Sequence, residues 1–191
     1  MTKLIAIPDR FIVTDEQFEQ LAIANQELKL ETTSEGVLVV MPPTGGDTGR
    51  KNMSISAQLY FWNKNTLSGY TFDSSTLFVL PSGAKRSPDA SWVEKSRWEA
   101  LTVEQQKSFP PLCPDFVIEL KSPSDSLKSL QTKMREYMDN GAKLGWLIVP
   151  DNKTIYVYEA DGSTQTLSDL IVISGGNILP GFELDLKDIF D

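Results

Sequence analysis

A strand, a long helix and a two-stranded hairpin follow one another directly in the second half of the chain, and this succession most constrains its fold. Residues 116–121 are mostly apolar, with β-branched and aromatic side chains, and predict a strand. A helix is expected over 126–140, with Gly141 placed to end it. Strands are expected over 144–149 and 154–159, joined by a proline-containing turn. This order is typical of a mixed α/β fold.

The first half of the chain adds further helices and strands. Thr14 and Gln17 have the spacing of a capping box that opens a helix. The remaining predicted segments are a strand at 35–41, a helix ending near residue 66, and strands at 70–80 and 87–93. With 191 residues, no internal repeat and no long linker, we expect one domain, residues 1–191, of α/β (α+β mixed) class with one sheet and helices on it.

The chain contains no histidine and a single cysteine, Cys113. The absence of histidine excludes Ser-His-Asp and Cys-His nucleophile systems, a histidine general base, and His-ligated zinc or iron. One cysteine forms neither an internal disulfide nor a thiolate metal site, and its apolar surroundings predict a buried, inert thiol. Polar chemistry must therefore rely on carboxylates, Lys, Tyr, Ser or that thiol.

The net charge of −8 argues against nonspecific coating of nucleic acid. The charge is unevenly distributed, because segments 43–97 and 121–143 are net basic while the rest of the chain is net acidic. Such basic segments are typical either of an anion site or of solvated surface.

The N-terminal segment, residues 1–10, lacks the basic start and long apolar run of an export signal. No stretch approaches the roughly 18 apolar residues that would cross a membrane. We therefore expect no membrane partner and a cytoplasmic protein in a reducing compartment.

Charged side chains alternate with apolar ones in the predicted strand 116–121. Because side chains alternate across a strand, Ile118 and Leu120 share one face while Glu119 and Lys121 share the other, about 7 Å apart. On an edge strand this pair is an ordinary polar face, whereas inside a sheet it is costly without partners. The pair is therefore either a surface feature or part of a site.

A second carboxylate, Asp89, follows a proline in the predicted strand 87–93. An Asp and a Glu on adjacent strands can share a divalent cation, and Mg²⁺ favours one or two carboxylates with water and phosphate oxygens. A lysine beside them can position the attacking water and stabilise a pentavalent phosphorus. Asp115 is a worse partner for Glu119, because four residues of strand separate them by about 13 Å.

These residues resemble the PD-(D/E)xK nuclease signature, with Pro88-Asp89 followed by Glu119-Leu120-Lys121. The wider sequence is similar to the Uma-two family of restriction endonucleases. The matching segments are 31–46, 87–89, 115–122 and 133–148. The resemblance implies a restriction-endonuclease-like core, a mixed central β-sheet flanked by helices, with a metal site at one end of the sheet.

The same resemblance implies roles for individual side chains. Asp89 and Glu119 would bind Mg²⁺, or Mn²⁺ in its place, and Lys121 would orient the nucleophilic water. Glu31, which stands at a matched position upstream, would complete the catalytic set. Glu31 fits equally well a solvated glutamate at the end of a helix, and both interpretations stay open.

Three residues of the predicted helix 126–140 are candidates for substrate binding. Lys133 and Tyr137 are four residues apart and lie on one helix face, where the resemblance suggests contacts to phosphate or water. They fit equally well a packing tyrosine and a lysine whose stem covers apolar surface. Gln131 points elsewhere on an ideal helix and is kept in reserve.

The leading hypothesis is a Mg²⁺-dependent endonuclease that hydrolyses phosphodiester bonds of DNA through a PD-(D/E)xK site. The alternatives are a catalytically silent nucleic-acid- or protein-binding domain on the same fold, and an ordinary α/β domain in which Glu119 and Lys121 form a surface pair. Exposed aromatic side chains around Trp92 and Trp98 would suit a homodimer, as would the cutting of both strands of a duplex.

Overall fold

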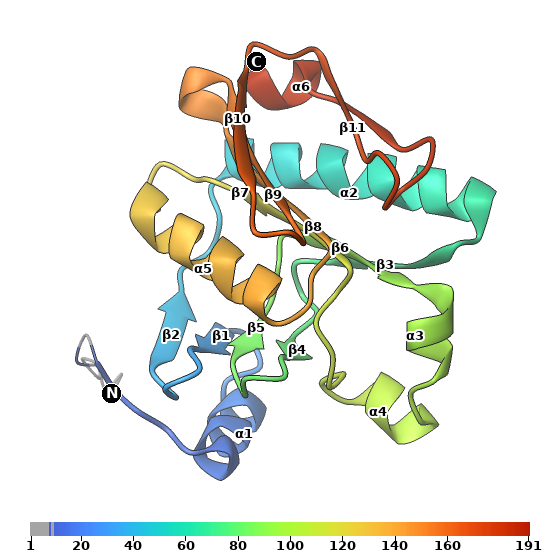
Figure 1. Ribbon diagram of the computed structural model, residues 1–191. Helices are drawn as coiled ribbons and strands as arrows, with labels where there is room; N and C mark the ends of the chain where they lie inside the picture. The colour runs from blue at the N-terminus through green and yellow to red at the C-terminus, as the bar shows by residue number, and fades with distance from the viewer. Residues whose placement is uncertain (1–7, 9) are drawn as a thin grey trace.

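The fold is built on a six-stranded mixed sheet that runs through the middle of the molecule (Figure 1). The computed structural model describes residues 8 and 10–191; residues 1–7 and 9, which hold most of the N-terminal segment considered above, lie outside them. In sheet order the strands are β10 (Thr164–Ser168), β9 (Thr154–Glu159), β8 (Leu144–Val149), β7 (Phe116–Leu120), β6 (Ala90–Glu94) and β3 (Gly69–Asp73). Strands β7 and β8 are parallel and the other neighbours are antiparallel, so the sheet is mixed as expected.

Helices cover both faces of this sheet. The long helix α2 (Gly46–Thr66) and the short α6 (Lys187–Phe190) lie on one face, and α5 (Leu127–Asp139) lies on the other (Figure 1). A hydrophobic core lies on each face of the sheet, and the side chains of β7 point to them alternately. Ile118 packs in the core on the α2 side and Val117 in the core on the α5 side. The predicted alternation across this strand is confirmed, and it directs Glu119 toward α5.

A smaller sheet packs beneath α5 together with α1 (Asp15–Ala24). Its strands in order are β2 (Leu38–Met41), β1 (Lys29–Thr32), β5 (Lys85–Arg86) and β4 (Phe78–Val79). The remaining elements are α3 (Lys95–Glu99), α4 (Val103–Lys107), the 3₁₀ turn η1 (Pro150–Asn152), and the pair β11 (Val172–Ser174) and β12 (Glu183–Asp185). Strand β5 leads directly into the loop before β6, which joins the two sheets at one end.

Local signals account for the ends of the predicted helices. The Thr14 hydroxyl accepts a hydrogen bond from the Gln17 amide while the Gln17 side chain accepts one from Thr14, which is a complete capping box. Helix α5 is capped by the Ser126 hydroxyl, and Gly141 follows it with a positive φ of 98°. The hairpin of β8 and β9 forms at the predicted residues.

Tertiary structure changes three of the sequence-based expectations. The predicted strand 70–80 is two strands, because Ser75 donates to the Asp73 carboxylate in a turn between them. Helix α2 begins at Gly46, inside the segment expected to be a glycine-rich loop. Strands β1 and β10 lack a strong alternating pattern and form by pairing with neighbours.

The expectation of exposed aromatic side chains around Trp92 and Trp98 is wrong for Trp92. Trp92 is buried on β6 in the middle of the sheet, where its indole N–H donates to the Asn63 side chain. Trp98 packs against Phe72 with ring centroids 4.9 Å apart. Tyr70, which packs on Trp98 with ring centroids 5.7 Å apart, is 37% exposed, and the homodimer stays a prediction.

No helix in the described part of the chain combines the length and the apolar character needed to cross a membrane.

Candidate active site

A cleft of about 900 Å³ lies where the small sheet meets one end of the main sheet. Its walls come from β1, from the start of α2, and from the loop and first turns of α5. The side chains of Glu31, Asp89, Glu119 and Lys133, all predicted from the sequence, line it together. The fold thus gathers into one place residues that are up to 102 positions apart in the chain.

Glu119 lies at the inner end of the cleft and is only 4% exposed. Its Oε1 accepts a hydrogen bond of 2.9 Å from the Tyr137 hydroxyl and lies 2.8 Å from Lys133 Nζ. Both partners stand on the inner face of α5, one turn apart, as the spacing predicts. Since both contacts use Oε1, neither of them engages the second carboxylate oxygen.

Lys133 joins Glu119 to Glu31. Its Nζ lies 2.9 Å from Glu31 Oε1, and that oxygen also accepts the Ser87 amide at 2.8 Å. The other Glu31 oxygen pairs with Arg86 Nη1 at 3.1 Å. Glu31 lies on β1 and is 1% exposed, so the interpretation as a solvated helix-end glutamate is wrong.

Asp89 occupies the loop immediately before β6, beside the end of β7. Because Ala90 pairs with Ile118, the next residues outward, Asp89 and Glu119, lie on neighbouring strands. One oxygen of Asp89 accepts the Leu120 amide at 2.9 Å, and the other lies 4.0 Å from Lys29 Nζ. With both carboxylates in one cleft and Glu119 buried, the reading of Glu119 and Lys121 as a surface pair is wrong.

The charged side chains around Glu31, Asp89 and Glu119 form a cluster. Among the described residues, this cluster holds more acids than bases. Its acids are Glu31, Asp89, Glu119 and Glu136, and its bases are Lys29, Arg86 and Lys133. Burial raises the pKa of Glu119 to about 7, because Lys133 only partly offsets the cost of desolvation and Asp89 and Glu31 add repulsion. Burial likewise raises the pKa of Asp89.

Glu31 differs from these two acids. Burial acts to raise its pKa, but Lys133, Arg86 and the Ser87 amide together outweigh that cost and hold the pKa below its usual range. The pKa of Lys133 is raised, because its contacts with Glu119 and Glu31 exceed the cost of burial. Glu31 and Lys133 are therefore both charged, while Asp89 and Glu119 lack full compensation.

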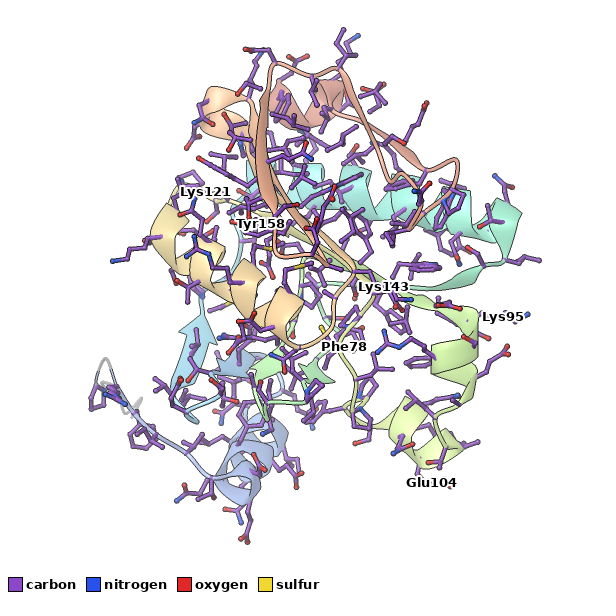
Figure 2. The ribbon with its side chains drawn as sticks, in the orientation of Figure 1. Phe78, Lys95, Glu104, Lys121, Lys143 and Tyr158 are labelled. Carbon is purple, nitrogen blue, oxygen red and sulfur yellow. The ribbon has the colours of Figure 1, made fainter. Side chains whose placement is uncertain are left out.

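Lys121 is not brought to the carboxylates. Its Nζ donates to the Ser122 carbonyl at 3.0 Å and lies 3.5 Å from the Asp151 carboxylate, next to η1. Figure 2 labels it beside the start of α5, at the end of β7. Gln131, the reserve candidate, is absent from the described residues that line the cleft. The ammonium group beside Glu119 thus comes from Lys133, twelve residues beyond the position that the signature indicates.

Asp115 lies at the opposite end of β7, away from the cleft. Its carboxylate accepts the Glu94 amide at 2.8 Å and pairs with Arg97 at 2.8 Å and Lys143 at 3.0 Å. Figure 2 places Lys143 at the far end of α5 from Lys121. The strand-length argument against Asp115 as a partner of Glu119 agrees with this position.

Two cleft residues were missed by the sequence argument. Arg86 directly precedes the Ser87-Pro88-Asp89 segment, so its place beside the motif was an available signal. Asn52, on the second turn of α2, lines the cleft and donates to Asp89 Oδ1 at 3.3 Å. Nothing in the sequence marked Asn52, because its position depends on how α2 packs across the sheet.

The oxygen-rich donor set suits a hard divalent cation. Among the described residues no three acidic or thiol side chains gather into a metal-binding group. The two adjacent carboxylates of Asp89 and Glu119, with raised pKa values, instead match the preference of Mg²⁺ for one or two carboxylates plus water and substrate oxygens. The residues present therefore fit Mg²⁺ or Mn²⁺.

The chain is similar in fold to solved structures and in sequence to a known protein family. A solved structure, described as a putative nuclease belonging to DUF820 from Anabaena variabilis ATCC 29413, superposes with a TM-score of 0.79 at 21% identity, covering 93% of this chain and 97% of that one. No curated protein matches the sequence. The family model Uma2, described as "Putative restriction endonuclease", matches residues 15–187. The chain therefore belongs to the Uma2 family of putative restriction endonucleases.

Proposed function

We propose that this chain, acting as one domain over residues 1–191, is a Mg²⁺-dependent endonuclease that hydrolyses phosphodiester bonds of DNA. Asp89 and Glu119 hold the cation, for which Mn²⁺ can substitute. The observation that carries the proposal is the pair of neighbouring carboxylates, buried Glu119 on β7 and partly buried Asp89 in the loop before β6, which share one cleft and lack full compensation by the protein's own cations. Membership of the Uma2 family supports the nuclease role.

The charge balance favours a bound cation. A buried carboxylate without full compensation is costly, and the pKa values of Asp89 and Glu119 rise for this reason. A divalent cation held by these two carboxylates would supply the missing positive charge. When bound, it would polarise the phosphate and lower the pKa of a bound water.

Lys133, rather than Lys121, takes the place of the positioning lysine in this proposal. It lies 2.8 Å from Glu119 and 2.9 Å from Glu31, so it fixes both carboxylates and keeps Glu31 ionised. The Tyr137 hydroxyl fixes the same Glu119 oxygen from the next turn of α5. Together they leave the second oxygen of Glu119 for the cation.

The walls of the cleft suit a phosphate-bearing substrate. The first turn of α5 faces the cleft, with Ser126 at the cap and Ser129 among the lining residues. The unpaired amides and the dipole at a helix N-terminus favour an anion. Lys29 and Lys128 line the same space and add positive charge near the rim.

A cleavage assay tests the proposal directly. Purified protein with Mg²⁺ or Mn²⁺ is expected to cut DNA, and Glu119→Gln or Asp89→Asn to lower the rate by about a hundredfold or more, since each removes a charge that holds the cation. Asp151→Asn, an exposed acid outside the cleft, serves as the matched control and should cleave normally.

The silent binding domain is the competing function. Calorimetric titration with Mg²⁺ separates the two, because a binding module needs neither carboxylate. If the wild-type protein takes up no Mg²⁺ or Mn²⁺ and cuts no DNA of any form, the nuclease proposal fails and the binding domain is selected.

A further inference from the structure

Asn52 presents a buried oxygen that has no partner in the fold. Its Nδ2 donates to Asp89 Oδ1 at 3.3 Å, while its Oδ1 is shielded from solvent and accepts no hydrogen bond from any described residue. A buried amide oxygen left unsatisfied costs about 1–3 kcal/mol. Such an atom in a native fold calls for an explanation, and a ligand is one of the few available.

The orientation of the amide is fixed by its neighbour. Turning the side chain over would place Oδ1 against the Asp89 carboxylate, where two acceptors would repel one another. In the absence of a cation, the amide must therefore donate to Asp89 and leave its oxygen unpaired. A cation held by the neighbouring carboxylates would satisfy this oxygen where it stands, and the amide would keep its hydrogen bond to Asp89.

We propose that Asn52 is a third protein ligand of the divalent cation held by Asp89 and Glu119, contributing its side-chain oxygen Oδ1. Carbonyl oxygens join carboxylates and water as donors to Mg²⁺, Mn²⁺ and Ca²⁺. Asn52 lines the same cleft as both carboxylates and already contacts one of them. The inference rests on the proposed function and extends it by a residue that neither the PD-(D/E)xK pattern nor the sequence argument assigns.

The charges around Asn52 explain why a neutral amide, rather than a carboxylate, stands at this position. The cluster already holds more acids than bases among the described residues, so a third carboxylate beside Asp89 would raise the cost of the metal-free state. An amide supplies an oxygen without adding charge. It also stands on α2, a 21-residue helix packed across the sheet, and so brings a third element to the cation.

Two variants at this position separate a ligand from a residue that only orients Asp89. Asn52→Ala removes both roles. Asn52→Asp keeps an oxygen for the cation but loses the N–H that donates to Asp89 and places two carboxylates together. A ligand therefore tolerates Asp, whereas an orienting residue does not. Asn65→Ala, at an exposed position on the same helix, is the matched control.

The readout is the dissociation constant for Mn²⁺, measured by electron paramagnetic resonance of the free ion on the folded full-length chain. We expect Asn52→Ala to weaken binding by about tenfold to a hundredfold, Asn52→Asp to bind at least as tightly as wild type, and Asn65→Ala to match wild type. Circular dichroism melts confirm that each variant is folded.

The outcomes distinguish this inference from the proposed function. If wild type binds Mn²⁺ and Glu119→Gln does not, while Asn52→Ala binds as wild type does, Asn52 is no ligand and the proposed function stands. If Asn52→Asp binds as weakly as Asn52→Ala, Asn52 only orients Asp89 and the inference is overturned. If wild type takes up no Mn²⁺, the proposed function fails and this inference fails with it.

Discussion

Single side chains in this protein gain their chemistry from what surrounds them. Lys121 and Lys133 are both near the signature in sequence, yet only Lys133 is packed against Glu119 and Glu31. Lys121 is at the end of β7 and turns to Asp151, an exposed acid. The difference between a positioning lysine and a peripheral one is thus decided by the helix that follows the strand.

The two lysines should respond differently to truncation. Lys133→Ala leaves Glu119 and Glu31 buried without their shared cation, and we expect a loss of about 3–5 kcal/mol in unfolding free energy together with loss of cleavage. Lys121→Ala breaks only a partly exposed pair and should change stability by less than about 1 kcal/mol. Urea unfolding and the cleavage assay measure both quantities.

Lys133→Arg keeps the charge and is the folded comparison should Lys133→Ala prove too unstable to assay. If Lys121→Ala abolishes cleavage while Lys133→Arg cleaves normally, Lys121 rather than Lys133 is the positioning lysine.

Cys113 illustrates the opposite case, a reactive group made inert by its surroundings. The thiol is fully buried, donates to the Tyr137 carbonyl at 3.5 Å, and has its pKa raised to about 12 by burial. Because the thiolate is the reactive form, a thiol reagent at pH 8 should label the native protein at least a hundredfold more slowly than the urea-unfolded chain. Equal rates in the two states would contradict the burial.

At the level of elements, the site depends on how α2 is fixed to the sheet. Gly69 begins β3 directly after α2, and the Asn63 side chain exchanges hydrogen bonds with its backbone. A Cβ at Gly69 would lie 2.2 Å from the Val93 carbonyl oxygen and 2.4 Å from Trp92 Nε1. Only glycine permits this close approach of the first residue of β3 to β6, just after the end of α2.

Gly69→Ala is expected to lower the unfolding free energy by about 1–3 kcal/mol, because the added methyl group overlaps backbone that cannot move freely. Gly49→Ala, in the first turns of the same helix with open space around its Cβ position, should raise stability by up to about 1 kcal/mol. Denaturant melts compare the pair. A Gly69→Ala protein as stable as wild type would mean that β3 and β6 can move apart at this point without cost.

At the level of the whole molecule, the cleft lies between two sheets whose strands alternate along the first half of the chain. Glu31 comes from the small sheet, whereas Glu119 comes from the main sheet, and Lys133 bridges them from α5. A cation held by Asp89 and Glu119 would therefore fix the loop that joins β5 of the small sheet to β6 against β7 of the main sheet.

Magnesium should raise the melting temperature of the wild-type chain. At a Mg²⁺ concentration about 100 times the dissociation constant the gain is about 2.7 kcal/mol, which corresponds to about 5–10 °C for a chain of this size. Differential scanning fluorimetry measures the shift. Glu119→Gln removes the charge but keeps the shape of the side chain, so Mg²⁺ should raise its melting temperature much less. If the variant shows the same increase as wild type, the cation binds at another place.

Patterns that are local in sequence were predictable. The alternation of β7, the capping box of Thr14 and Gln17, helix α5 and the hairpin of β8 and β9 each follow from residues a few positions apart. Burial of Cys113 follows from its apolar neighbours in the chain. The adjacency of Asp89 and Glu119 was also within reach, because two strands of one sheet and a strand face suffice to place them.

The mixed α/β class, the exclusion of histidine chemistry, and the faces on which Glu119, Lys133 and Tyr137 lie all follow from the order and types of the residues, because they depend on short periodicities and on composition. The burial of Glu31 beside Lys133, the turning of Lys121 away from the cleft and the contact of Asn52 with Asp89 come from long-range packing. Each of these depends on the pairing of β1 with β5 or on the packing of α2 and α5, and such contacts are set by burial across the whole chain rather than by neighbours in sequence.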